Sequence, residues 1–110
     1  MPISSRVAFG VACLFVSPAL ADEAAPSFKE IKQIISSRCQ TCHSEETSQP
    51  GIYEAPKGIK LDTAFEITTY APKINEQVVV ARLMPLGNVT EMTEEERKKI
   101  AAWFAAGAKQ

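Results

Sequence analysis

The sequence lacks a second histidine, an excess of either charge and an apolar run long enough to cross a membrane. Its 110 residues carry 12 Lys and Arg against 13 Asp and Glu, with a net charge of -1. A nucleic-acid binder needs a basic stripe that neutralises phosphates, so we expect no DNA or RNA partner. The apolar fraction of 45% is too high for a disordered chain. Length and composition together indicate one small folded domain.

The first 21 residues have the composition of a secretory signal peptide. Arg6 is their only charge, an apolar run follows over 7–16, and residues 19–21 (Ala-Leu-Ala) supply the small side chains of a cleavage site. The run is about half of the ~20 residues that a spanning helix needs. We therefore expect export and cleavage after Ala21, with no stable membrane insertion. An uncleaved membrane anchor is the alternative, which the short run and Pro18 disfavour.

The mature domain, residues 22–110, has two cysteines, and both belong to the motif Cys39-Gln40-Thr41-Cys42-His43. Cys-x-x-Cys-His is the arrangement of c-type haem attachment. Thiols three positions apart on a helical turn face the same side, so Cys39 and Cys42 can form thioethers with the two vinyl groups of one porphyrin. His43 then lies under the iron as its proximal ligand. The motif predicts one covalently bound haem c per chain.

Three other interpretations of these cysteines are weaker. A thioredoxin-type dithiol normally lies at a strand-to-helix turn, and no alternation of strands and helices is indicated here. A zinc site needs about four ligands, and the mature chain has no Cys or His beyond this motif. A disulfide between Cys39 and Cys42 would close almost no loop and add little stability. Haem c is attached outside the bacterial cytoplasm, which agrees with export and predicts a periplasmic location.

Because His43 is the only histidine, the second axial ligand within one chain must be another kind of residue or be absent. Methionine is the usual partner of histidine in electron-transfer cytochromes c, and the mature chain offers Met84 and Met92. Pro85 favours an extended Met84, followed by a Gly-Asn turn, so we expect a loop that aims Met84 at the iron. Met92 directly precedes a capping box, which favours a packing role. A core Met84 beside a five-coordinate iron is the alternative.

The chain begins and ends with predicted amphipathic helices. A capping box at 27–30 begins a first helix that ends near Arg38. A second box at 93–96 begins a last helix, which runs to about Ala106 with Gly107 as its C-cap. We expect its Ile100, Trp103 and Phe104 to be buried, and its Arg97, Lys98 and Lys99 to lie on the solvated side.

The segment between these helices is expected to be a loop followed by two short helices. Residues 44–60 are loop by composition, and a carbonyl near Pro56 is expected to accept the second N–H of His43. Asp62 can cap a helix that ends at Thr69. Pro72 can begin another, with Ile74, Val78 and Ala81 on one side, although the β-branched run 78–80 leaves a strand as the alternative.

These features resemble the class I cytochromes c, which combine an N-terminal helix, Cys-x-x-Cys-His, a distal methionine often followed by proline, and a packed C-terminal helix. The resemblance implies an all-α fold of three to five helices around one haem. Segments 55–63 (APKGIKLDT) and 84–97 (MPLGNVTEMTEEER) also look like the C-terminal cytochrome domain of bacterial membrane-bound urate hydroxylases. That resemblance implies His43 and Met84 as axial ligands. In those proteins the domain carries electrons away from urate oxidation, and a predicted signal peptide here replaces their membrane portion.

The expected function is that of a monomeric electron carrier rather than an enzyme. A peroxidase normally needs a distal acid-base group, which a chain with one histidine does not readily supply. The expected partners are redox proteins that bind transiently, namely a urate-oxidising or other dehydrogenase as donor and an oxidase or another cytochrome as acceptor. Two alternatives are a haem-based small-molecule sensor, which needs an open distal site, and a haem subunit held permanently in a larger oxidoreductase.

Overall fold

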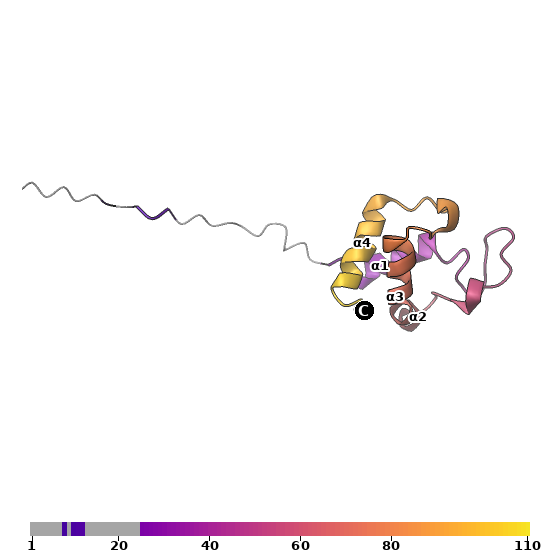
Figure 1. The fold of residues 1–110 in the computed structure, drawn as a ribbon. Coiled ribbons are helices and arrows are strands. Elements are labelled where there is room, and N and C mark those ends of the chain that lie inside the picture. Colours follow the sequence, from indigo (N-terminus) through magenta and orange to yellow (C-terminus); the bar gives the residue numbers. More distant parts are fainter. Residues whose placement is uncertain (1–7, 9, 13–24) are drawn as a thin grey trace, which may run out of the picture.

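The computed structural model describes residues 8, 10–12 and 25–110, and over this part of the chain every regular element is helical (Figure 1). In chain order the elements are α1 (Phe28–Arg38), η1 (Pro56–Gly58), α2 (Ala64–Thr69), α3 (Ala71–Ile74), η2 (Asn75–Val80), η3 (Leu86–Asn88) and α4 (Glu94–Ala105). The expectation of an all-α domain is confirmed. The predicted signal peptide and its cleavage after Ala21 fall almost entirely outside the described residues.

Both long helices begin with the capping boxes that the sequence predicts. At α1 the Glu30 amide donates to Ser27 Oγ (3.2 Å), and the Ser27 amide donates to Glu30 Oε2 (3.1 Å). At α4 the Glu96 amide donates to Thr93 Oγ1 (3.1 Å), and the Thr93 amide donates to Glu96 Oε1 (2.8 Å). Each box satisfies two backbone donors that a helix start otherwise leaves without partners, and so fixes where the helix begins.

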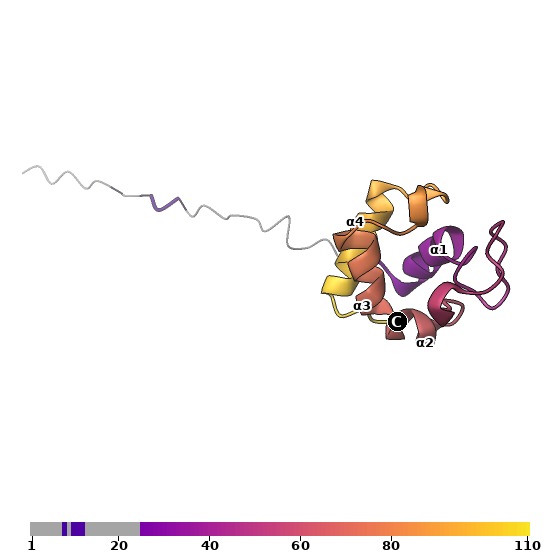
Figure 2. The same ribbon diagram turned by 45° about the vertical axis from the view of Figure 1, so that its right-hand side comes forward.

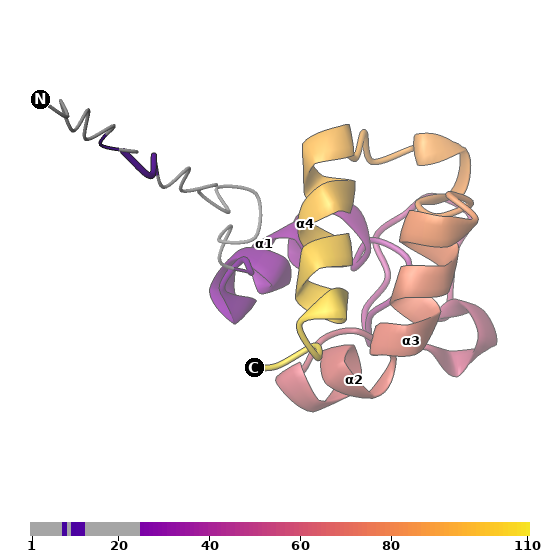
Figure 3. The ribbon, with the colours of Figure 1, turned by 60° about the vertical axis from the view of Figure 1, so that its left-hand side comes forward.

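Helix α4 packs on α1 and on η2, and this packing makes the core (Figure 3). Ile31 and Ile35 of α1 and Ile100 of α4 are fully buried, and Trp103 is 2% exposed. The rings of Phe28 and Trp103 stack with centroids 6.3 Å apart. The expected buried stripe of α4 is therefore confirmed for Ile100 and Trp103, while Phe104 is half-buried and packs at the edge of the core.

Gly107 ends α4 in a Schellman motif. The Ala108 amide donates to the Trp103 carbonyl (2.9 Å) and the Gly107 amide donates to the Phe104 carbonyl (3.0 Å). Gly107 has φ +106, which glycine adopts without steric cost. The prediction of a glycine stop is confirmed, with Gly107 directly after the C-cap residue Ala106.

The short helices differ from the prediction at two points. Thr63, not Asp62, caps α2: the Glu66 amide donates to Thr63 Oγ1 (3.1 Å), whereas Asp62 Oδ2 accepts from the Glu45 amide (2.8 Å). A Thr-x-x-Glu pattern at 63–66 is the capping box that the sequence analysis missed.

Helix α3 starts with Pro72 in its first turn, as expected, and continues without a break into the π-helix η2. The strand alternative for 78–80 is therefore wrong. Ile74 and Val78 are buried, but Ala81 is exposed. The wider turn is the reason, because the Ala81 amide donates to the Glu76 carbonyl five residues back (2.8 Å), and the face defined by α-helical spacing then turns away from the core.

A charged contact joins the end of α1 to the start of α4. Arg38 Nε donates to both carboxylate oxygens of Glu96 (3.0 and 3.2 Å), and its Nη1 donates to the Thr90 carbonyl (2.6 Å). Thr90 Oγ1 donates back to the Arg38 carbonyl (2.8 Å). Partial desolvation raises the pKa of Glu96, but hydrogen bonds from Thr93 and Arg38 outweigh it, so the net pKa of this carboxyl is lowered.

Replacing Glu96 by Ala is expected to lower the free energy of unfolding by about 1–3 kcal/mol, because the change removes one half of a capping box and a charge-assisted bond. Urea titration measures this. Since the folded pKa of Glu96 lies below the ordinary value of 4.5, the contribution is complete above that pH and is lost as pH falls through the lowered value. Glu95→Ala, at an exposed position of the same turn, is the control, and an equal loss there would contradict the assignment.

Candidate functional site

The Cys-x-x-Cys-His motif forms a turn at the C-terminal end of α1. Cys39 is the C-cap residue, and its amide donates to the Ile35 carbonyl (2.9 Å). The Cys39 carbonyl then accepts from the amides of Cys42 (3.2 Å) and His43 (2.8 Å). These bonds close the motif into one turn directly after α1. No disulfide joins Cys39 and Cys42.

The His43 ring is oriented by a backbone carbonyl. Its Nδ1 lies 2.8 Å from the Ile59 oxygen, and its own carbonyl accepts from the Leu61 amide (3.0 Å). A carbonyl can only accept, so Nδ1 carries a proton, and Nε2 is the ring nitrogen that remains for a metal. This is the arrangement that commonly orients a metal-bound histidine. The acceptor was expected near Pro56, and it lies just after the turn η1 that begins there.

A cleft of about 180 Å³ brings most of the predicted site residues together. Cys39, His43 and Met84 all line it, although they come from different parts of the chain. Cys42 lies on the same turn but does not belong to this lining. The other lining residues come mainly from η1 and the α3–η2 helix: Pro56, Lys57, Ile59, Leu61, Tyr70, Lys73, Ile74, Gln77 and Val78. Most of the surface that faces the cleft is apolar.

The Cys39 thiol is uncharged at neutral pH. Burial raises its pKa to about 12, with smaller contributions from Cys42 and Glu96, while Arg97 acts in the opposite direction. A catalytic or redox-active dithiol needs a lowered pKa, because the thiolate is the nucleophile. The environment of Cys39 therefore disfavours the thioredoxin-type interpretation.

Met84 is held at both ends of its backbone. Its amide donates to the Gln77 carbonyl (3.1 Å), as does the preceding amide of Leu83 (2.8 Å). The Met84 carbonyl accepts from Arg97 Nη1 (2.8 Å). The side chain is half-buried, which suits a thioether at the wall of a cleft.

Met92 has a different environment. It is 4% exposed and belongs to the hydrophobic core rather than to the cleft lining. The Asn88 side chain fixes its backbone, since Oδ1 accepts from the Met92 amide (2.9 Å) and Nδ2 donates to the Met92 carbonyl (3.2 Å). The packing role expected for Met92 agrees with this burial, and of these two methionines only Met84 lines the cleft.

Arg97 is another residue whose environment differs from the expectation. It was expected on the solvated side of the last helix, but it is only 7% exposed. Its Nη1 donates to the carbonyls of both Val78 and Met84, each at 2.8 Å. The helical spacing could have predicted this position, because Arg97 lies three residues before Ile100 and seven before Phe104, on the same face of the helix. The burial of Arg97 was not predicted, because charged side chains are expected to avoid the apolar face of a helix.

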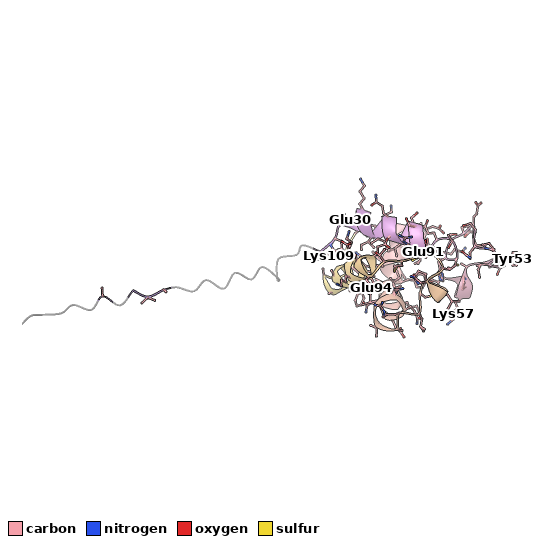
Figure 4. All side chains as sticks on the ribbon, turned by 90° about the horizontal axis from the view of Figure 1, so that it is seen from above. Glu30, Tyr53, Lys57, Glu91, Glu94 and Lys109 are labelled. Atoms are coloured by element: carbon pink, nitrogen blue, oxygen red, sulfur yellow. The ribbon has the colours of Figure 1, made fainter. Side chains whose placement is uncertain are left out.

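Four exposed apolar side chains lie within five residues of Met84 in the chain. Val80, Leu83, Leu86 and Val89 are each more than half exposed. They flank Met84 along the chain. Tyr53 and Lys57 lie at the end of the domain away from Glu30 and Lys109 (Figure 4), and Figure 2 shows α1 and α4 from a second side. Lys57 and Lys73 add two cations to the cleft lining.

Over the described residues, no three His, Cys, Asp or Glu side chains are grouped so that they could hold a metal ion. A haem iron takes its other nitrogens from the porphyrin and does not call for such a group. None of the described helices is long and apolar enough to span a membrane. Comparison with protein-family models, curated proteins and solved structures finds no match.

The burial of Met92 predicts a large effect on stability. Met92→Ala is expected to lower the free energy of unfolding by about 2–5 kcal/mol, because it removes a buried side chain and leaves a cavity. Leu86→Ala, at a position 70% exposed, is the matched control and is expected to change it by less than about 0.5 kcal/mol. Chemical denaturation followed by far-UV circular dichroism measures both. Equal losses would show that Met92 is not a core residue.

Proposed function

We propose that the chain is a monohaem c-type cytochrome that transfers single electrons between redox partners. The observation that carries the proposal is the meeting of Cys39, His43 and Met84 at one largely apolar cleft. A thiol, an imidazole and a thioether are the donor set of a His-Met haem c. The described residues therefore fit the group that the Cys-x-x-Cys-His motif predicts.

Each residue has a distinct part in holding the group. Cys39 and Cys42 would bind it as thioethers from the turn that ends α1. His43 would bind the iron through Nε2, since Nδ1 is engaged by the Ile59 carbonyl. Met84 would be the second axial ligand, held in place through its backbone. When bound, the haem supplies a one-electron couple between ferric and ferrous iron, and thioether ligation favours the ferrous state.

The exposed side chains near Met84 bear on how a redox partner would approach the cleft. The exposed apolar side chains at 80, 83, 86 and 89 lie next to Met84 in sequence and give a redox partner a surface for brief contact.

The proposal includes a periplasmic location, since haem c is attached outside the bacterial cytoplasm and residues 1–21 resemble a cleaved export signal. The proposed partners are a dehydrogenase as donor, a urate-oxidising one among the candidates, and an oxidase or another cytochrome as acceptor. The same exposed apolar side chains also favour a second candidate, a haem subunit that stays bound to a larger oxidoreductase. Co-purification with a partner from the native host distinguishes it from a free carrier, which is expected to elute alone as a monomer.

The ligand assignment predicts different spectra for two matched variants. In protein matured with haem-attachment machinery, Met84→Leu is expected to lose the near-infrared thioether band of the ferric state and to bind carbon monoxide when reduced. Met92→Leu, the control, is expected to keep the band and exclude carbon monoxide, because the swap preserves core volume. Visible and near-infrared absorption measures both. The reverse pattern would make Met92 the ligand, and an open iron in the unaltered protein would favour a small-molecule sensor.

A further inference from the structure

We propose that Arg97 is the positioning residue for Met84, and that it keeps the thioether at the cleft by binding the carbonyls of Met84 and Val78 together. The inference rests on the proposed function, since it names the residue that fixes the second axial ligand. Arg97 itself does not line the cleft, so it would act through Met84 and not by touching the haem.

A single nitrogen atom of Arg97 makes both hydrogen bonds. One nitrogen, Nη1, carries two N–H bonds and donates one to each carbonyl at 2.8 Å. Val78 belongs to η2, which packs against the cleft, whereas Met84 lies in the segment after that helix. A planar guanidinium fixes the angle between its two N–H bonds, so the two carbonyls are held in one relative position. The bridge thereby couples Met84 to the helix that forms one wall of the cleft.

A second link completes the restraint on Met84. Its amide donates to the Gln77 carbonyl (3.1 Å), which is also part of η2. The amide and the carbonyl of Met84 are therefore both tied to the same helix, one directly and one through Arg97. Removing the guanidinium leaves the Met84 carbonyl and the Val78 carbonyl without this donor and frees one end of the residue.

The burial of Arg97 argues that the contact has more than a local role. Arginine usually keeps its charged head in water, as exposed Lys98 on the same helix does. Arg97 instead is 7% exposed, and its nearest acidic partner, Glu94, is itself mostly exposed and lies 3.9 Å away. Burying a charge is costly unless hydrogen bonds compensate for the lost water, and these two carbonyls supply that compensation.

The positive charge would also act at the cleft. Arg97 Nη1 lies 2.8 Å from the carbonyl of Met84, a residue that lines the cleft. A cation near a redox centre favours its more electron-rich state. Loss of Arg97 is therefore expected to lower the reduction potential, in addition to releasing Met84.

The test compares three variants of the haem-loaded protein: Arg97→Gln, Arg97→Lys and Lys98→Gln. Arg97→Gln is expected to lose most of the ferric thioether band, to bind carbon monoxide when reduced and to have a lower potential. Arg97→Lys keeps a cation with several donors and is expected to retain more of the ferric thioether band than Arg97→Gln does. Lys98→Gln removes the same charge from an exposed neighbouring position and is expected to match the unaltered protein.

Hydrogen exchange separates positioning from a general loss of fold. In Arg97→Gln, the hydrogen-bonded amides of Leu83, Met84 and Asn88 are expected to exchange about tenfold faster or more, while those of α1 keep their protection. If Arg97→Gln fails to fold, Arg97→Lys carries the test: a weakened band with unchanged far-UV circular dichroism supports the proposal, and a band of full strength overturns it.

The outcomes also separate this inference from the proposed function. A thioether band and carbon monoxide exclusion in Arg97→Gln equal to those of the unaltered protein would overturn the role of Arg97 and leave the cytochrome assignment intact. Absence of covalent haem from the unaltered protein would overturn both. Faster exchange with an unchanged band would show that Arg97 stabilises the segment without positioning the ligand, which also overturns the inference.

Discussion

The packing of α4 on α1 is the contact on which the site depends, because α1 leads into the turn of His43 and α4 binds the backbone of Met84. Helix α1 leads directly into the turn that bears Cys39, Cys42 and His43. Helix α4 carries Arg97, which holds the backbone of Met84. The stacked rings of Phe28 and Trp103 and the Arg38–Glu96 pair fix the two helices against each other. The relative position of His43 and Met84 is thus set by contacts made outside the cleft.

Local signals in the sequence predicted the ends of the helices well. Hydrogen bonds within a few residues decide where these helices begin and end. The expected signals occur at Ser27 with Glu30, at Thr93 with Glu96, and at Gly107. The motif and the lone histidine likewise narrowed the candidate site to a few side chains. Such features need no knowledge of the tertiary structure, which is why composition and spacing were enough to find them.

The features that were missed have different causes, since the capping box of Thr63 and Glu66 is as local as those of the two long helices. Ala81 was expected on a buried face, but a π-helical turn changes the spacing after Val78, and nothing in a run of valines reveals that turn. Arg97 was expected in solvent, because its carbonyl partners lie 19 and 13 residues away in the chain. A buried cation on an apolar helix face becomes predictable only when the backbone groups that satisfy it are known.

The central claim is that Cys39 and Cys42 hold one haem covalently. The most direct measurement is the intact mass of the denatured protein after export in a host with haem-attachment machinery, beside a Cys39→Ala/Cys42→Ala double variant. The account predicts a mass increase of one haem that survives denaturation and is absent from the double variant. Unmodified cysteines in the exported protein under conditions that load other c-type cytochromes would contradict it.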